Sequence, residues 1–263
     1  MKLFDTHAHY YDKKFEDADA LLSSPEFTDK VGNVINIASN PENSETVISQ
    51  AKKYDFMHCA VGIHPSDAQS YGESEFEANI DKIRGFLSDE GLRQENKIVA
   101  IGEIGFDYYW QPVDRELQYK YFDAQMRLAE EFSLPVIIHD REAHKDTFDM
   151  ICKYPDVKGI IHSCSMSDEM VRQLCAKGWY ISFSGTVTFK NAHKVQASCA
   201  ATDIDKLLSE TDAPYLAPHP YRGQINNSLL MEKTVEKMAE LHNVTYEEML
   251  EITNTNAGKI FGL

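Results

Sequence analysis

Six short apolar segments of this chain end in a histidine or a carboxylate, the residue types that bind divalent metal ions. Apolar segments of this length predict strands that are buried on both faces, as in a parallel sheet. Ligand residues that recur at the carboxyl ends of such strands predict an α/β barrel with a metal site at its mouth. The ligand-type residues of the six segments are His7 and His9, then His64, Glu103, His139, His162 and Asp212.

His7 and His9 are two residues apart at the end of the first segment. Side chains two apart in a strand point to the same side, so we expect both imidazoles to bind one ion. Asp212 follows the last strand segment, which lies beside the first strand when a barrel closes. We therefore predict Asp212 as the third ligand of this ion. We also predict it as a catalytic residue that orients or deprotonates a metal-bound water.

Glu103 lies among apolar residues and glycines, where a carboxylate without a partner is costly to bury. A metal ion is the simplest partner, and a buried salt bridge is the alternative. A carboxylate can bridge two ions about 3.5–4 Å apart, so we predict Glu103 as a bridging catalytic residue. His139 and His162 end the fifth and sixth strands and are the predicted ligands of the second ion. This mixed ligand set predicts two divalent ions and suits Mg²⁺, Mn²⁺ or Zn²⁺.

Several other residues at the same expected face have more than one interpretation. His64 and Glu210 either hold a third ion, contact a leaving group or support the loops. Arg222 either holds a phosphate oxygen of a substrate through its planar guanidinium or is a surface arginine. Arg141 has the same two interpretations. Asp107 is either an outer partner of the metal site or a loop cap.

The elements that must position these residues alternate along the chain as strand and helix. The length of 263 residues is close to the roughly 250 typical of a (β/α)8 TIM barrel, the predicted fold class. No linker or internal repeat is present, so we predict a single domain over residues 1–263. Strands are expected at 2–6, 31–38, 58–63, 98–103, 135–139, 159–162, 179–182 and 206–211. Helices are expected at 41–54, 75–90, 115–132, 142–153, 168–177, 191–200, 229–242 and 246–255.

The composition restricts the partners and the location of the protein. Acidic residues outnumber basic ones 42 to 26, and the net charge of −16 argues against a broad electrostatic surface for nucleic acid. A polyanionic substrate would therefore be held locally, by metals and a few basic residues. No segment approaches the roughly 18 apolar residues of a membrane span, and we expect no signal peptide. Five cysteines without CxxC spacing predict reduced thiols and a cytoplasmic protein.

Taken together, these motifs resemble the TatD-type metal-dependent deoxyribonucleases, which belong to the amidohydrolase-like TIM barrels. The resemblance runs over nearly the whole chain, through residues 5–9, 62–65, 102–108, 139–141, 162–165, 183–185 and 210–216. It implies two divalent metals and hydrolysis of phosphodiester bonds in a DNA substrate, often from a 3′ end and with single-stranded ends as the expected form. Related amidohydrolases often bridge their metals with a carboxylated lysine from the fourth strand, and Glu103 at that position favours the TatD-like branch.

Two segments depart from the family pattern. The family loop usually has Arg-Gly-x-x-Asn-Glu-Pro, whereas residues 222–228 are Arg-Gly-Gln-Ile-Asn-Asn-Ser; residues 162–165 are His-Ser-Cys-Ser where His-Cys-Phe-Ser is common. Neither change removes a proposed ligand, so both bear on the substrate more than on the reaction. A metal-dependent amidohydrolase or esterase for a small molecule is the alternative function. A non-catalytic metal-binding barrel is disfavoured because every proposed ligand is present, and we expect no obligate protein partner.

Overall fold

A computed structural model describes all 263 residues. Its eight strands form one sheet in which the strand order follows the sequence from β1 to β8. The described strand pairs are parallel, as in β4 with β5 and β7 with β8. This is the strand order of the (β/α)8 TIM barrel, so the predicted fold class is confirmed. No helix combines the length and the apolar character that crossing a membrane requires.

Most elements agree with the predicted ranges to within a few residues. The strands are β1 (Leu3–Ala8), β2 (Val31–Ile37), β3 (Met57–Val61), β4 (Ile98–Asp107), β5 (Val136–Arg141), β6 (Gly159–Ile161), β7 (Tyr180–Phe183) and β8 (Leu207–Ser209). The α-helices are α1 (Ala18–Leu22), α2 (Pro25–Lys30), α3 (Pro41–Lys53), α4 (Pro65–Tyr71), α5 (Phe76–Leu87), α6 (Glu90–Glu95), α7 (Arg115–Phe132), α8 (His144–Lys153), α9 (Asp168–Ala176), α10 (His193–Ala201), α11 (Glu232–His242) and α12 (Tyr246–Phe261). Short 3-10 helices are η1 (Glu73–Glu75), η2 (Gly185–Thr188), η3 (Ile204–Lys206) and η4 (Ser228–Met231).

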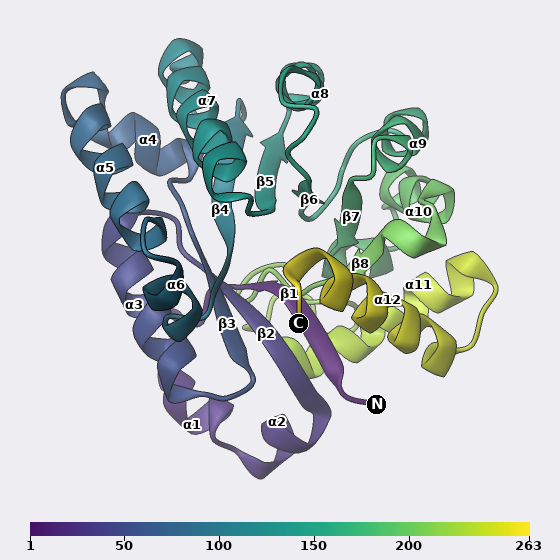
Figure 1. The fold of residues 1–263 in the computed structure, drawn as a ribbon. Coiled ribbons are helices and arrows are strands. Elements are labelled where there is room, and N and C mark those ends of the chain that lie inside the picture. Colours follow the sequence, from purple (N-terminus) through teal and green to yellow (C-terminus); the bar gives the residue numbers. More distant parts are fainter. The chain divides into compact units, whose positions relative to one another are not determined.

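The chain divides into two compact units, residues 1–36 with 162–263 and residues 37–161. In the first unit β1 pairs with β2, β7 pairs with β8, and Ala8 at the end of β1 bridges to Ala213 beyond β8. Helix α12 packs against β1 and against α11, as Figure 1 shows. The loops that follow β7 and β8 therefore belong to the same unit as the end of β1. The single domain over 1–263 stays a prediction.

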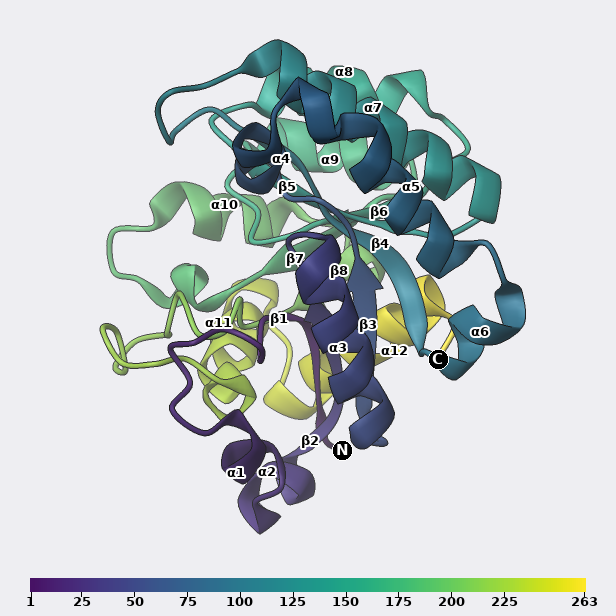
Figure 2. The ribbon, with the colours of Figure 1, turned by 90° about the vertical axis from the view of Figure 1, so that its left-hand side faces the viewer.

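In the second unit β3, β4, β5 and β6 pair in sequence order. Helix α3 lies along β3 (Figure 2), and α7 packs against β4 and against α4 and α5. Most residues of these strands are buried, with Ile101, Ile104 and Ile138 at 0% exposure, whereas β5 becomes exposed at its end, at Arg141. An added Cβ at Gly105 (φ +138°) would lie 2.0 Å from a carbonyl oxygen of β5, so glycine is required where β4 and β5 approach most closely.

Four predictions of the elements were wrong in detail. The helix predicted at 246–255 continues to Phe261. Strand β4 continues to Asp107, so Glu103 lies inside the strand instead of at its end. The helix predicted at 75–90 ends at Leu87, because the side chain of Asp89 accepts the N–H of Leu92 and starts the separate helix α6. Helices α1, α2 and α4 were not predicted, since five to seven residues are too few to show an amphipathic period.

Candidate metal centre

His7, His9 and Asp212 come together in the first unit. His7 lies in β1 and His9 just beyond it, and their Nε2 atoms are 3.1 Å apart, on the same side as predicted. Oδ1 of Asp212 lies 3.5 Å from Nε2 of His9 and 3.9 Å from Nε2 of His7. The backbone N–H of Asp212 donates to the His7 carbonyl at 2.9 Å, so the main chain itself holds the carboxylate beside the histidines.

Nε2 of His7, Nε2 of His9 and Oδ1 of Asp212 form a triangle, the donor triangle, whose size fits a metal ion. A point equidistant from the three donor atoms lies about 2 Å from each, which is the length of the bonds that zinc makes to imidazole nitrogen and carboxylate oxygen. Two neutral imidazole nitrogens that face each other present either two lone pairs or one proton and one lone pair. A cation at the centre satisfies both lone pairs and the carboxylate at once, so His7, His9 and Asp212 can hold one divalent ion.

Asp212 is prepared to act as an anion. Burial works to raise its pKa, but the hydrogen bond with His9 and the neighbouring imidazoles of His162 and His7 hold the pKa below its ordinary value. Its backbone has φ 56°, in the left-handed region that few residues other than glycine adopt. Such strain is typical of functional positions. The lowered pKa favours the ionised form of Asp212 at neutral pH, the form that a metal ligand requires.

His162 and Glu210 lie beside this cluster in the same unit. The His162 ring stacks on the His7 ring, with centroids 4.0 Å apart. Glu210 is fully buried; its Oε1 accepts the N–H of Ser163 at 2.8 Å and faces Nδ1 of His162 at 3.2 Å. With a proton on Nδ1, His162 turns the lone pair of Nε2 outward, and carboxylates commonly orient metal-binding histidines in this way.

Glu210 gives a further indication that the cluster binds cations. Its second oxygen, Oε2, is buried and has no hydrogen-bond partner. An unpartnered buried carboxylate oxygen is destabilising unless a positive charge lies nearby. The geometry favours a role for Glu210 that was not among the three interpretations drawn from the sequence: it orients His162 and adds negative charge beside the cluster.

Glu103, His64 and His139 form a second cluster, in the other unit. Oε1 of Glu103 lies 2.8 Å from Nδ1 of His139 and 3.7 Å from Nε2 of His64. Nδ1 of His64 accepts the N–H of Ser66 and so caps α4, which places the proton of the neutral imidazole on Nε2, the atom directed at Glu103. Binding of a metal ion through Nε2 would require this proton to move to Nδ1 and the cap to break. These three side chains can hold a divalent ion. His64 thus joins Glu103 and His139, although the sequence left its role open.

Asp107 fills both roles that the sequence left open. Its Oδ1 accepts the N–H groups of Tyr109 and Trp110 and caps the loop after β4, and its Oδ2 lies 3.0 Å from Nε2 of His139. Burial works to raise the pKa of Asp107, but the hydrogen bond with His139 and these backbone N–H groups lower it. An ionised Asp107 accepts the Nε2 proton of His139, so the lone pair of Nδ1 faces Glu103. Two acceptors 2.8 Å apart need a proton or a metal cation beside them.

Asp5 was not among the predicted site residues, although it precedes His7 by two residues, the same spacing as between His7 and His9. Its fully buried carboxylate accepts the N–H of His7 and both the N–H and the hydroxyl of Thr211. Ser228 donates to it at 2.7 Å from the segment where the chain departs from the family pattern. Burial outweighs these hydrogen bonds and raises the pKa of Asp5 to about 6. Asp5 therefore ties the ends of β1 and β8 together beneath the donor triangle.

The arginines and Cys164 are not among the side chains that could together hold a metal ion. The guanidinium of Arg141 stacks over the Tyr109 ring, 4.7 Å from its centroid, and that of Arg222 stacks over Phe189 at 4.6 Å. Cys164 is buried, and nothing around it indicates thiol chemistry.

Comparisons with known proteins agree with this class of site. The family model described as TatD related DNase matches residues 4–262. The "Uncharacterized metal-dependent hydrolase YabD" of Bacillus subtilis (strain 168) is 34% identical over 262 residues, which cover 98% of either chain. YcfH of Escherichia coli (strain K12), named in the same words, is 31% identical over 99% of this chain and 96% of its own. The crystal structure of YJJV, a TatD homolog from Escherichia coli K12, superposes with a TM-score of 0.88 at 26% identity, over 99% of this chain and 98% of that one.

A barrel of parallel strands with histidine and carboxylate clusters in and just after the strands is typical of one class, the metal-dependent hydrolases. Within it, the chain belongs to the family of TatD-related DNases, as the resemblance of its motifs predicted. It is accordingly a metal-dependent hydrolase of the TatD family, with two clusters of metal-ligating residues. Cleavage of DNA, the number of ions and the ligand of each ion stay predictions.

Proposed function

We propose that this protein is a divalent-metal-dependent deoxyribonuclease that hydrolyses phosphodiester bonds from the 3′ ends of single-stranded DNA. The observation that carries the proposal is the triangle of His7, His9 and Asp212, whose donor atoms lie 3.1 to 3.9 Å apart. Family membership supports the choice of DNA as substrate. We also propose that the protein works in the cytoplasm, which its five free cysteines support.

Two divalent ions, when bound, lower the pKa of a water molecule and stabilise the charge that develops on the phosphate. We propose His7, His9 and Asp212 as ligands of the first ion and His139 and His162 as ligands of the second. Glu103 is the proposed bridge, as its place in the fourth strand predicts. The ionised carboxylate of Asp212 accepts the proton of the attacking water, and its lowered pKa keeps it available for this at neutral pH.

His64 and Glu210 support these ligands in the proposal. His64 directs Nε2 at Glu103 and is a further candidate ligand once its proton has moved to Nδ1, while Glu210 holds the orientation of His162. We propose that Arg222 binds a phosphate of the substrate through its guanidinium fork.

The test is cleavage of a labelled single-stranded oligonucleotide by the Mg²⁺- or Mn²⁺-loaded protein. We expect Asp212→Asn to lower the rate by about 10² to 10⁴, the usual contribution of a general base, with no change in circular dichroism. Asp205→Asn is the matched control, because Asp205 is an exposed carboxylate just before β8 whereas Asp212 follows β8. This control variant should cleave DNA at the wild-type rate. Cleavage by Asp212→Asn at the wild-type rate would refute the assignment.

A metal-dependent amidohydrolase or esterase is the second candidate. The net charge of −16 favours it, because a long polyanion is repelled by most of such a surface. The same protein and variants are therefore assayed on small esters and cyclic amides. Hydrolysis of these by wild type, lost in Asp212→Asn and combined with no cleavage of any DNA, would replace the nuclease proposal.

A further inference from the structure

Two segments of the first unit contain no acidic residue. They are residues 184–202, after β7, and residues 213–231, after β8, in a chain that has 42 carboxylates in all. Both follow the carboxyl ends of strands, as His9 and Asp212 do. The net charge of −16 repels anions from the protein as a whole, but these two segments contribute no negative charge to that repulsion.

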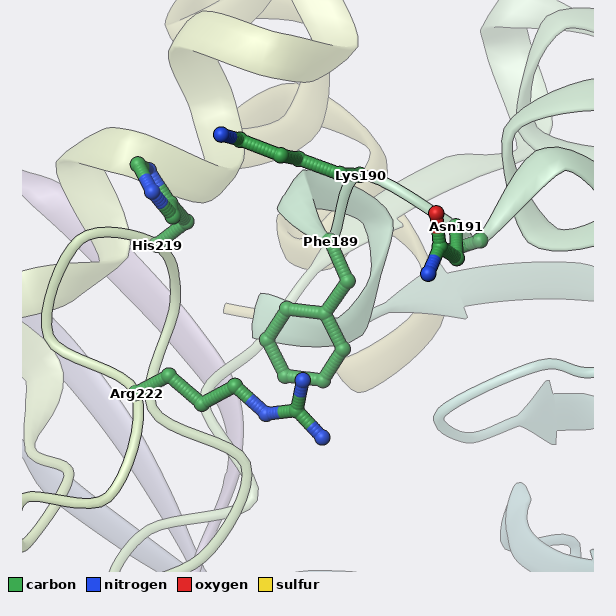
Figure 3. Close-up of a pocket in the computed structure, with 6 residues that line it drawn as sticks. Phe189, Lys190, Asn191, His219 and Arg222 are labelled. Carbon is green, nitrogen blue, oxygen red and sulfur yellow. The ribbon is translucent and has the colours of Figure 1, made fainter.

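The two segments line a cavity of about 580 Å³ that is open to solvent. Figure 3 shows the guanidinium of Arg222 lying against the ring of Phe189 and the Lys190 side chain extending toward His219. The lining residues are Phe189, Lys190, Asn191, Ala192, His219 and Arg222. None of them belongs to the clusters that can hold metal, so the cavity is a separate site with a lysine, an arginine and a histidine facing one space.

The charges of this cavity are uncompensated by the protein. Neither Lys190 nor Arg222 forms a salt bridge, and neither of the two segments contains a carboxylate. Stacking on Phe189 orients the guanidinium plane while its N–H edges remain available for an acceptor. In Figure 3 the Lys190 ammonium extends to the other side of the pocket from Arg222, so the oriented guanidinium is the group that matches a phosphate, and Lys190 adds positive charge to the same space.

The walls of the cavity are also fixed in place. The N–H of His219 donates to Oγ1 of Thr188 at 2.8 Å, which joins the two segments. An added Cβ at Gly185 would lie 2.1 Å from the carbonyl oxygen of Leu216, so the segments touch backbone to backbone there. Gln196 donates to the carbonyls of residues 187 and 189. The cavity therefore exists before a ligand arrives, which reduces the ordering that binding requires.

We propose that this cavity binds a backbone phosphate of the single-stranded DNA substrate, at a linkage other than the one being cleaved. The inference rests on the proposed nuclease function and adds how a strongly acidic protein holds a polyanion. Arg222 binds the phosphate oxygens through two N–H groups, and Lys190 adds a point charge. This local contact substitutes for the broad basic surface that the protein lacks.

Equilibrium binding tests the proposal without requiring cleavage. The probe is fluorescein-labelled dT8 with phosphorothioate linkages at its 3′ end, and the readout is fluorescence anisotropy with metal-loaded protein. We expect Arg222→Gln to raise the Kd about tenfold and to lower the slope of log K against log salt by about 0.7, the value for one single-strand phosphate contact. Lys190→Gln should act in the same direction. Lys194→Gln is the control, because that exposed lysine lies in the same acid-free segment but does not line the cavity.

A second measurement locates the phosphate. Probes with one neutral methylphosphonate at each successive linkage should reveal one internal position that weakens binding to wild type, and that position should have no further effect in Arg222→Gln. A Kd for Arg222→Gln within twofold of wild type, an equal loss in Lys194→Gln, or no binding of the probe by wild type would each overturn the proposal. Wild-type binding with this pattern but no cleavage of DNA would instead refute the nuclease function alone.

Discussion

Replacing Asp107 by asparagine should weaken the binding of metal at the cluster of Glu103 and His139. Asparagine has the shape of aspartate, and its carbonyl oxygen can still accept the N–H groups that cap the loop after β4. Its amide group, however, presents a donor to Nε2 of His139 in place of the acceptor found 3.0 Å away. His139 can satisfy this donor only by moving its proton to Nδ1. That proton then lies on the atom 2.8 Å from Glu103, where the metal needs a lone pair.

The size of the effect follows from the energy of such outer hydrogen bonds. Replacing the hydrogen-bond partner of a metal-binding histidine typically lowers metal affinity by about 10- to 100-fold, or roughly 1.4 to 2.7 kcal/mol. The apoprotein should lose little stability, because Asp107→Asn keeps a hydrogen bond at every one of these positions. In Asp107→Asn we therefore expect a lower metal affinity with little change in the folding stability of the apoprotein.

Calorimetric titration of the apoprotein with Mn²⁺ or Zn²⁺ measures the first quantity, and urea unfolding measures the second. Asp89→Asn is the matched control, since this exposed residue caps α6 in the same unit and asparagine caps a helix equally well. A metal affinity of Asp107→Asn within twofold of wild type would show that His139 does not need this tautomer. A large loss of apoprotein stability would show that Asp107 acts mainly as a loop cap.

Two further predictions concern stability. Ser228→Ala should lower the free energy of unfolding by about 1 to 3 kcal/mol, because it removes the hydroxyl that donates at 2.7 Å to the buried carboxylate of Asp5; urea unfolding that shows under 0.5 kcal/mol would contradict this. Burial and the charge of Lys97 lower the pKa of His58 from 6.5 to about 4, so the unfolded chain binds more protons between these values and stability falls as the pH drops through that window. Since His58 is partly exposed, we expect about 1 kcal/mol, visible as a smaller loss of stability in His58→Asn between pH 7.5 and 5; equal losses in both proteins would refute the assignment.

The sequence predicted the donor atoms best where the period of a strand determines them. His7 and His9 face the same side because they are two apart along β1, and this needs no knowledge of distant contacts. Asp5 shows the same spacing from His7 and was available to the same reasoning, but its four hydrogen bonds come largely from residues more than 200 positions away. Partners at that separation become visible only when β1 and β8 lie together.

The role of His64 was beyond the sequence for a different reason. It follows β3 and caps α4, a helix of seven residues that shows no amphipathic period. Its approach to Glu103 depends on the register of β3 with β4, and that of His139 depends on β4 and β5 passing closely at Gly105. Strand register between different segments is set by side-chain packing in three dimensions, and local sequence does not encode it in a readable way.

The residues that depart from the family loop pattern, Asn227 and Ser228, form hydrogen bonds within the protein. Asn227 and Ser228 stand where Glu-Pro is usual, which suggested an altered contact with substrate. Their side chains instead point into the protein's own structure: Oδ1 of Asn227 accepts the N–H of Leu229 at the start of η4, and Ser228 is buried against Asp5 and Tyr10. The side-chain oxygens of Asn227 and Ser228 are thus engaged in capping and in a buried network within the protein. Differences in substrate must therefore arise nearer the tip of the loop, where His219 and Arg222 face the cavity and no internal partner occupies the guanidinium edges.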